Sequence, residues 1–153
     1  MRRFPLTALV VGACLAFLST AGGPGARAAT PPKQPAQGPG GSDYAAADVT
    51  RRVLGTASAA TYAFYPTGAP KEPRPVIVFL HSWGAANPGL YGGWLEHLAR
   101  RGNLVLFPRF QDPNRTRPMD ATANAAALVK SALEALASDP DARPDLKRVA
   151  FIG

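Results

Sequence analysis

The sequence is poor in cysteine and histidine. Its single cysteine is Cys14, and His81 and His97 are the only histidines among its 153 residues. One cysteine and two histidines are too few for a disulfide framework or for a clustered Cys and His zinc site within the chain. The sequence also lacks a phosphate-binding loop. We therefore expect neither a metal nor a cofactor.

Basic charge is present but is not clustered. The formal net charge is +7 at pH 7, and the Lys and Arg residues are scattered along the chain. A nucleic-acid surface needs basic residues gathered on one face together with stacking aromatics. The sequence therefore predicts no nucleic-acid partner, and its mild basicity is typical of a surface that keeps a protein in solution.

Residues 1–28 have the pattern of a secretory signal peptide. A basic start precedes an apolar run over residues 6–18, and residues 26–28 fit the small-x-small pattern before a cleavage point. The run is too short to cross about 30 Å of hydrocarbon. We expect cleavage near Ala28, no stable membrane span afterwards, and a secreted or periplasmic protein.

Two alternatives to signal cleavage stay open. One is an uncleaved N-terminal anchor. The other is a lipoprotein, because Cys14 follows Val11-Gly12-Ala13 in the manner of a bacterial lipoprotein box. Against lipidation, the apolar run continues through residues 15–18, where a lipidated cysteine is normally followed by a polar tether.

The segment behind the leader, residues 29–42, consists mostly of Pro, Gly, Gln, Ala and Ser and has no apolar periodicity. Such a composition buries too little apolar surface to offset the entropy lost on ordering. We expect a flexible linker there and a folded domain over residues 43–153.

The folded part alternates between strand and helix patterns. Residues 49–56 and 60–65 predict a β-hairpin. Buried strands are predicted at residues 76–80, 104–107 and 148–152, with helices at 91–101 and 121–138 between them. This order is typical of parallel β-α-β units. We expect an α/β fold of three layers, α/β/α, with a mainly parallel sheet.

Two loops carry the pattern of a catalytic site. One buried strand opens into His81-Ser82-Trp83-Gly84, and the last strand runs into Gly153. Together they resemble the α/β-hydrolases, in which an H-G-x-G-like loop supplies half of an oxyanion hole and strand-then-Gly begins the G-x-S-x-G nucleophile elbow. Within that superfamily, residues 76–111 are similar to bacterial secreted dienelactone hydrolases, chlorophyllase-like enzymes and polyester-cleaving esterases.

The resemblance implies a serine hydrolase that cleaves small or polymeric carboxylic esters through an acyl-enzyme. It assigns the first oxyanion donor to the backbone N–H of Trp83, with loop support from His81, Ser82 and Gly84. Ser82 departs from the motif, which usually has Gly there. The nucleophile would come two residues after Gly153. We therefore expect only the N-terminal half of the hydrolase fold here, with all triad members absent and no turnover.

Aromatic residues near these loops are candidates for a substrate pocket. Tyr91 and Trp94 belong to the segment that borders the site in the family, and Phe110 lies just beyond the carboxyl end of a predicted parallel strand, with Arg109 and Asp112. Each also fits a simpler role. Core packing would account for the first two, and a solvated loop would account for the other three.

Other functions fit the same fold, because one scaffold hosts many reactions. A prolyl-peptidase-like or acyl-transferring hydrolase is one alternative. Another is a secreted binding module or pseudoenzyme that keeps the sheet without the triad. In that case His81 would be an ordinary core histidine in a strand-to-helix loop.

The leader generates a prediction about the exported protein. Because residues 26–28 form the cleavage pattern, its mature N-terminus should be Ala29 or Thr30. Intact-mass spectrometry of protein recovered from outside the cytoplasm measures this directly. A retained Met1, or a lipid on Cys14, would contradict the prediction.

Overall fold

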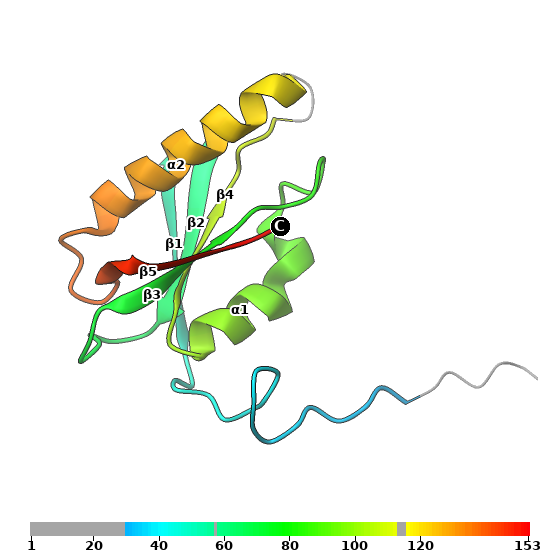
Figure 1. Cartoon of the computed structure of the whole chain (residues 1–153), viewed down its shortest axis with the longest axis vertical. Helices are drawn as coiled ribbons and strands as arrows, with labels where there is room; N and C mark the ends of the chain where they lie inside the picture. The colour runs from blue at the N-terminus through cyan, green and yellow to red at the C-terminus, as the bar shows by residue number, and fades with distance from the viewer. Residues whose placement is uncertain (1–29, 57, 113–115) are drawn as a thin grey trace, which may run out of the picture. The chain divides into compact units, whose positions relative to one another are not determined.

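The structure is a computed structural model that describes residues 30–56, 58–112 and 116–153, so the predicted signal peptide, residues 1–28, lies outside it. In the described part of the chain, five strands form one sheet in the order β1-β2-β4-β3-β5 (Figure 1). The strands are β1 (Val49–Thr56), β2 (Ala59–Pro66), β3 (Arg74–Phe79), β4 (Leu104–Pro108) and β5 (Pro144–Ile152).

The sheet is mixed, and the expectation of a mainly parallel sheet was wrong. β1 and β2 form the predicted hairpin, pairing antiparallel from Val49 with Pro66 to Thr56 with Ala59. β2 then pairs antiparallel with β4, so the hairpin is part of the main sheet. The parallel pairs are β3 with β4 and β3 with β5, in the part of the chain where helices connect successive strands. The direction of a pairing depends on the connection between strands, which the apolar patterns do not report.

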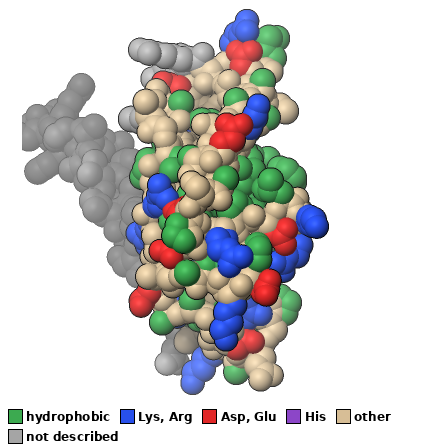
Figure 2. Space-filling model, turned by 90° about the vertical axis from the view of Figure 1, so that its left-hand side faces the viewer, with side chains coloured by type: hydrophobic (Ala, Val, Ile, Leu, Met, Phe, Trp, Pro, Cys, Tyr) green, Lys and Arg blue, Asp and Glu red, His purple; other side chains and the backbone are tan. Residues whose placement is uncertain are grey.

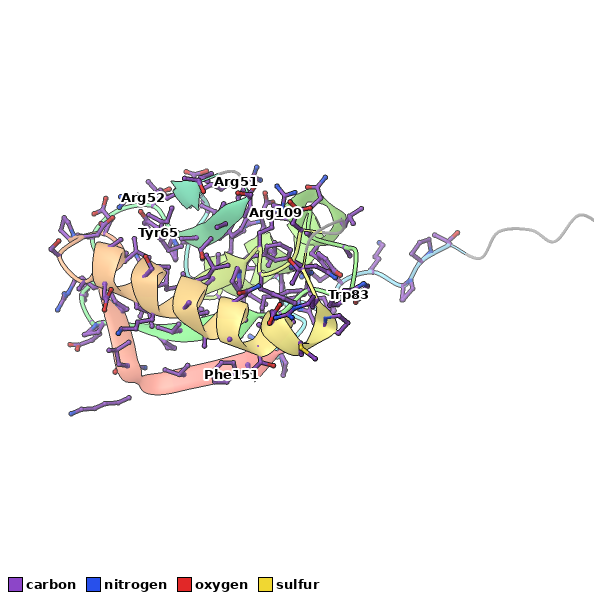
Figure 3. The ribbon with its side chains drawn as sticks, turned by 90° about the horizontal axis from the view of Figure 1, so that it is seen from above. Arg51, Arg52, Tyr65, Trp83, Arg109 and Phe151 are labelled. Carbon is purple, nitrogen blue, oxygen red and sulfur yellow. The ribbon has the colours of Figure 1, made fainter. Side chains whose placement is uncertain are left out.

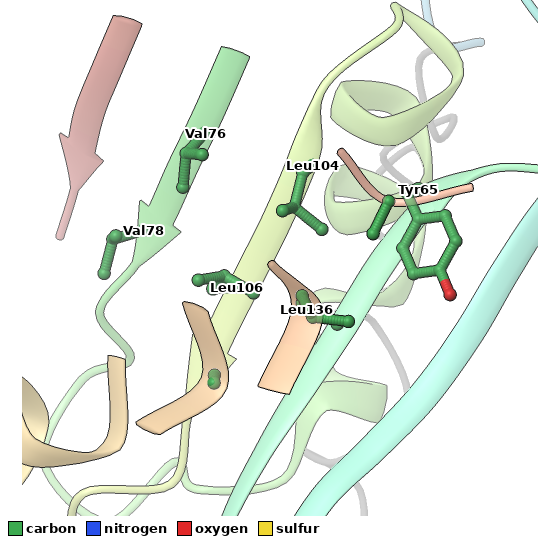
Figure 4. Close-up of a cluster of buried hydrophobic side chains, with 9 residues drawn as sticks. Tyr65, Val76, Val78, Leu104, Leu106 and Leu136 are labelled. Carbon is green, nitrogen blue, oxygen red and sulfur yellow. The ribbon is translucent and has the colours of Figure 1, made fainter. Parts of the chain in front are cut away.

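Helices cover both faces of the sheet, which confirms the α/β class (Figure 1). The helices are α1 (Gly92–Arg100) and α2 (Ala121–Leu136), preceded by the short 3₁₀ turns η2 (Pro88–Tyr91) and η3 (Pro118–Asp120). Successive strand residues point to opposite faces. The α2 side therefore buries Val76, Val78, Leu104, Leu106 and Leu136 (Figure 4). The α1 side buries Ile77, Phe79, Val105, Phe107, Leu95 and Ala99.

The ends of the first helix follow from local sequence signals. Asn87 caps η2 by accepting a hydrogen bond from the Gly89 N–H at 2.9 Å. Gly102 follows α1 with φ of +97°, a left-handed conformation that glycine adopts without a Cβ clash. Asp120, a residue type common at helix N-caps, precedes α2 but makes no capping bond and instead pairs with Arg117.

The segment before β1 has no helix or strand over residues 34–46, yet it contacts α1. The Tyr44 hydroxyl lies 3.1 Å from His97 Nδ1, and the Pro39 carbonyl lies 3.1 Å from His97 Nε2. The Arg100 guanidinium stacks 3.8 Å from the centre of the Tyr44 ring. The contact at Pro39 therefore holds part of the expected linker against α1, and a hydrogen bond and a cation–π contact hold Tyr44 just behind it.

The last strand has an uncovered apolar side. β5 pairs with β3 along one edge only, and Phe151 projects from it with 69% of its surface exposed (Figure 3). Between α2 and β5 lies an apolar groove of about 650 Å³, lined by residues that include Leu80, Val129, Leu133 and Phe151. Figure 2, which views the molecule from the left-hand side of Figure 1, shows hydrophobic side chains gathered there. An open strand edge with exposed apolar residues is prone to self-association.

This exposed edge predicts that the 153-residue chain aggregates and that a charge on β5 reduces the aggregation. Phe151→Lys should shift the purified chain from soluble aggregates toward monomer, because a lysine on an edge strand opposes pairing with another chain. Val53→Lys is the matched control, since Val53 is 62% exposed on β1, the opposite edge. Size-exclusion chromatography with light scattering separates the two. A monodisperse wild-type monomer, or equal improvement by both variants, would count against the prediction.

Candidate functional site

The carboxyl ends of β3, β4 and β5 meet at one edge of the sheet, as parallel pairing requires. There the Leu80 N–H donates to the Ile152 carbonyl at 2.7 Å. A Cβ built on Gly153 would lie 3.2 Å from Leu80 Cβ, so Gly153 is in contact with the start of the His81 loop. The loop after β3, the loop after β4 and the end of β5 are therefore neighbours, as expected.

The loop after β3 is a tight turn over residues 82–85. The Ala85 N–H donates to the Ser82 carbonyl at 2.9 Å, and Gly84 has φ of +82°. A positive φ at the third position is the signature of a type II turn and favours glycine there. Ser82 is not in the left-handed region. Its Cβ is therefore tolerated at the position where the hydrolase motif usually has Gly.

Side chains from two other elements bind the backbone of this turn. The Tyr91 hydroxyl accepts a hydrogen bond from the Ser82 N–H at 3.2 Å. Hydrogen bonding to the side chain of Ser82, and then to its N–H, lowers the pKa of Tyr91, because a donor stabilises the phenolate. On the other side of the turn, Gln111 Oε1 accepts from the Gly84 N–H at 2.6 Å. Between them, the Trp83 N–H has no hydrogen-bond partner among the residues that the structure describes.

The Trp83 side chain lies on the surface, with 55% of its area exposed. Figure 3 shows Trp83 and Arg109 toward the same end of the molecule. A cleft of about 450 Å³ lies at this end, and the residues that line it are Tyr62, Gly84, Ala86, Asn87, Pro88 and Arg109. The turn therefore borders an open space large enough for a small group of a ligand.

His81 is a buried part of the loop's support. It is 4% exposed, and its ring stacks on Phe110 with centroids 4.1 Å apart and planes 9° from parallel. Its Nδ1 lies 3.0 Å from the Ser82 carbonyl, which can only accept, so Nδ1 carries the hydrogen. Its Nε2 is buried and has no partner among the described residues.

Burial lowers the pKa of His81, because a charged imidazolium would lose its hydration. The hydrogen bond to the Ser82 carbonyl opposes this shift, and the nearby Arg109 charge adds to it. The ring is therefore neutral at pH 7 and fixed in one tautomer. Because His81 is buried and bound to the backbone of the turn, it fits support of the loop better than the role of a general base.

The three aromatic candidates for a pocket have different surroundings. Phe110 stacks on His81, and Tyr91 reaches the turn through its hydroxyl while its ring packs 5.0 Å from Phe79. Trp94 is half exposed and meets Phe79 edge-on at 5.0 Å. Tyr91, Trp94 and Phe110 are not among the residues that line the cleft. The structure thus brings Tyr91 and Phe110 to the loop and leaves Trp94 on the outer side of the α1 core.

Sequence reasoning missed Gln111, the residue with the shortest hydrogen bond to the loop. A glutamine close behind a buried strand, just after Phe110, was the only available signal. Tyr62 and Asn87 line the cleft, but the sequence indicated a functional role for neither, and Tyr62 was predicted only as part of a strand. In the described part of the chain, no three His, Cys, Asp or Glu side chains gather to hold a metal, and no helix is long and apolar enough to span a membrane.

The lowered pKa of His81 predicts how stability depends on pH. A folded pKa below the unfolded value of about 6.5 means that the unfolded chain binds the proton more readily. The free energy of unfolding should therefore be full above pH 7 and fall as the pH drops from 7 to 5. Urea titrations of the wild type and of His81→Phe across this pH range measure the effect. The variant should lose the part of the pH dependence of the free energy of unfolding that comes from His81. His97→Gln is the control and should keep it; equal slopes in wild type and His81→Phe would contradict the prediction.

Comparison with known proteins gives structural neighbours only. No family model matches the sequence, and no curated protein matches it. Solved structures with a similar fold include a provisionally assigned dienelactone hydrolase from Klebsiella pneumoniae subsp. pneumoniae MGH 78578, at 18% identity and a TM-score of 0.43. Another is a protein named m3DLH, at 19% identity and a TM-score of 0.46. Each match covers 69% of this chain and 49% of the other, so the chain spans about half the length of these neighbours.

Proposed function

We propose that this chain carries the oxyanion-hole half of a secreted serine hydrolase that acts on carboxylic esters. The observation that carries the proposal is the Trp83 N–H, which lies between two N–H groups bound by Tyr91 and Gln111 and has no partner of its own in the described part of the chain. It belongs to a turn that borders a cleft at the carboxyl edge of the sheet. An N–H in such a place can stabilise a negative oxygen.

The chemistry follows from that donor. A serine oxygen attacks the ester carbonyl carbon, and its proton passes to a base while negative charge develops on the carbonyl oxygen. The Trp83 N–H stabilises this oxyanion, and in this class a second N–H comes from the residue after the nucleophile. The intermediate then expels the alcohol, which takes the proton, and water later hydrolyses the acyl-enzyme. Each donor contributes about 3 kcal/mol to such a transition state.

The nucleophile would follow β5. Gly153 contacts Leu80, so the residues after it would lie beside the turn at residues 82–85. Neither histidine is engaged with a serine hydroxyl in the described part of the chain: His81 binds the Ser82 carbonyl, and His97 binds Tyr44 and Pro39. The described residues thus contribute binding and polarisation of the carbonyl, and none of their serines is activated by a histidine.

The substrate class is a small or polymeric ester with an apolar group beside the scissile bond. Trp83 supports this part of the proposal, because its indole is more than half exposed next to the donor. A secreted binding module on the same fold remains the competing function. We use the term longer gene product for the protein encoded when the reading frame continues past Gly153. Its sequence separates the two functions, since a hydrolase requires a Ser two residues after Gly153 and a later Asp and His.

The proposal predicts that Trp83→Pro in the longer gene product lowers turnover by about a hundredfold or more, because proline has no N–H. Proline is also well suited to the second position of a type II turn, so this change removes the donor with little cost to the turn. Trp83→Ala keeps the donor and should retain much of the turnover. The 153-residue chain should show none.

The assay is hydrolysis of p-nitrophenyl acetate and butyrate. Circular dichroism of both variants confirms that they are folded before the rates are compared. Turnover by the 153-residue chain above a heat-treated control, or a folded Trp83→Pro enzyme at full rate, would show that the site lies elsewhere.

A further inference from the structure

Gln111 connects the loop after β4 to the turn after β3. Its side chain is wholly buried, and its Oε1 accepts the Gly84 N–H at 2.6 Å across 27 residues of sequence. A buried amide oxygen without a donor is unfavourable, because it has lost its hydration and gained no hydrogen bond in return. The bond therefore stabilises the arrangement of the two loops in which Gly84 faces Gln111.

Tyr91 holds the turn from its other end. Its hydroxyl accepts the Ser82 N–H at 3.2 Å, and its ring is packed between Phe79 at 5.0 Å and Phe107 at 5.7 Å. These two strand residues are buried in the α1 side of the core. The hydroxyl thus has a fixed position from which it sets the direction of the Ser82 N–H.

The geometry points to Gln111 and Tyr91 as positioning residues of the oxyanion loop, an inference that rests on the proposed function. The peptide unit that carries the Trp83 N–H lies between two units whose N–H groups these side chains hold. Since both neighbouring N–H groups are occupied, the Trp83 N–H is the donor that the turn offers to a ligand.

The bond from Gly84 also selects the type of turn. Types I and II differ mainly by rotation of the central peptide, here the one between Trp83 and Gly84. Rotation to type I would turn the Trp83 carbonyl toward Gln111 Oε1, so that two acceptors would face each other. Gln111 therefore opposes a flip that would place the Trp83 carbonyl oxygen where the Gly84 N–H now lies, one peptide beyond the Trp83 N–H. Fixing dipoles before the reaction is what makes an oxyanion hole effective.

A matched pair of substitutions at Gln111 tests this. Gln111→Met keeps the length of the side chain and removes the acceptor, whereas Gln111→Glu keeps an acceptor oxygen. In the longer gene product, Gln111→Met should lower kcat by about tenfold or more with little change in KM, because the donor is misplaced while the cleft is intact. Gln111→Glu should restore most of the loss. Rates are normalised to the folded enzyme by active-site titration, so that a loss of folded protein alone does not lower them.

Tyr91→Phe is the independent variant, since it removes one hydroxyl and leaves the packed ring. It should lower kcat by about threefold to tenfold at an unchanged KM. If Gln111→Met does not fold, Tyr91→Phe alone tests whether these side chains position the loop. Wild-type kcat in folded Gln111→Met, or in folded Tyr91→Phe when the other variant cannot be made, would overturn the inference.

A second readout separates this inference from the proposed function. Amide hydrogen exchange at Gly84, followed by ¹⁵N NMR, should be at least about tenfold faster in Gln111→Met than in wild type or Gln111→Glu, because only the first lacks the acceptor. If the wild-type product has no turnover, the proposed function fails while faster exchange still supports the contact. Equal exchange in all three proteins would overturn the positioning role whatever the turnover.

Discussion

The parallel pairing of β3 with both β4 and β5 is the constraint on which the rest of the structure depends. Because the three strands run in one direction, the loops that follow them emerge at one edge of the sheet. Their central strand, β3, is apolar from Pro75 to Phe79 and is covered by a helix on each face. The core thus fixes where the loops begin, while their shape is left to polar contacts.

Two of those polar contacts come from buried side chains. His81 and Gln111 are both buried, and each holds the backbone of the turn through one atom of its side chain. Buried polar groups make strong hydrogen bonds but are costly when a partner is missing. A loop organised in this way has a narrow range of conformations. This suits a donor that must be in place before a ligand arrives.

The sequence predicted the elements of the fold well and their relations less well. Strands and helices were found because apolar periodicity is a local property, and the loop with Trp83 was found because its four residues are adjacent. The direction of β2 against β4 was missed, since no local pattern reports which strands pair. Gln111 was missed for the same reason. Its role depends on Gly84, which is distant in sequence and becomes a neighbour only when β3 and β4 align.

β5 is the last strand of the described chain, yet its partner β3 is the third of the five and precedes it by about seventy residues. The hairpin of β1 and β2 joins neighbours in sequence and can form quickly. Val76 of β3, in contrast, can pair with Val149 of β5 only after Val149 has been synthesised. On the ribosome, β3 therefore keeps one open edge until nearly all of these residues have been synthesised. During that interval, a chaperone that binds apolar strands would be most effective at keeping the unpaired edge of β3 from associating with other chains.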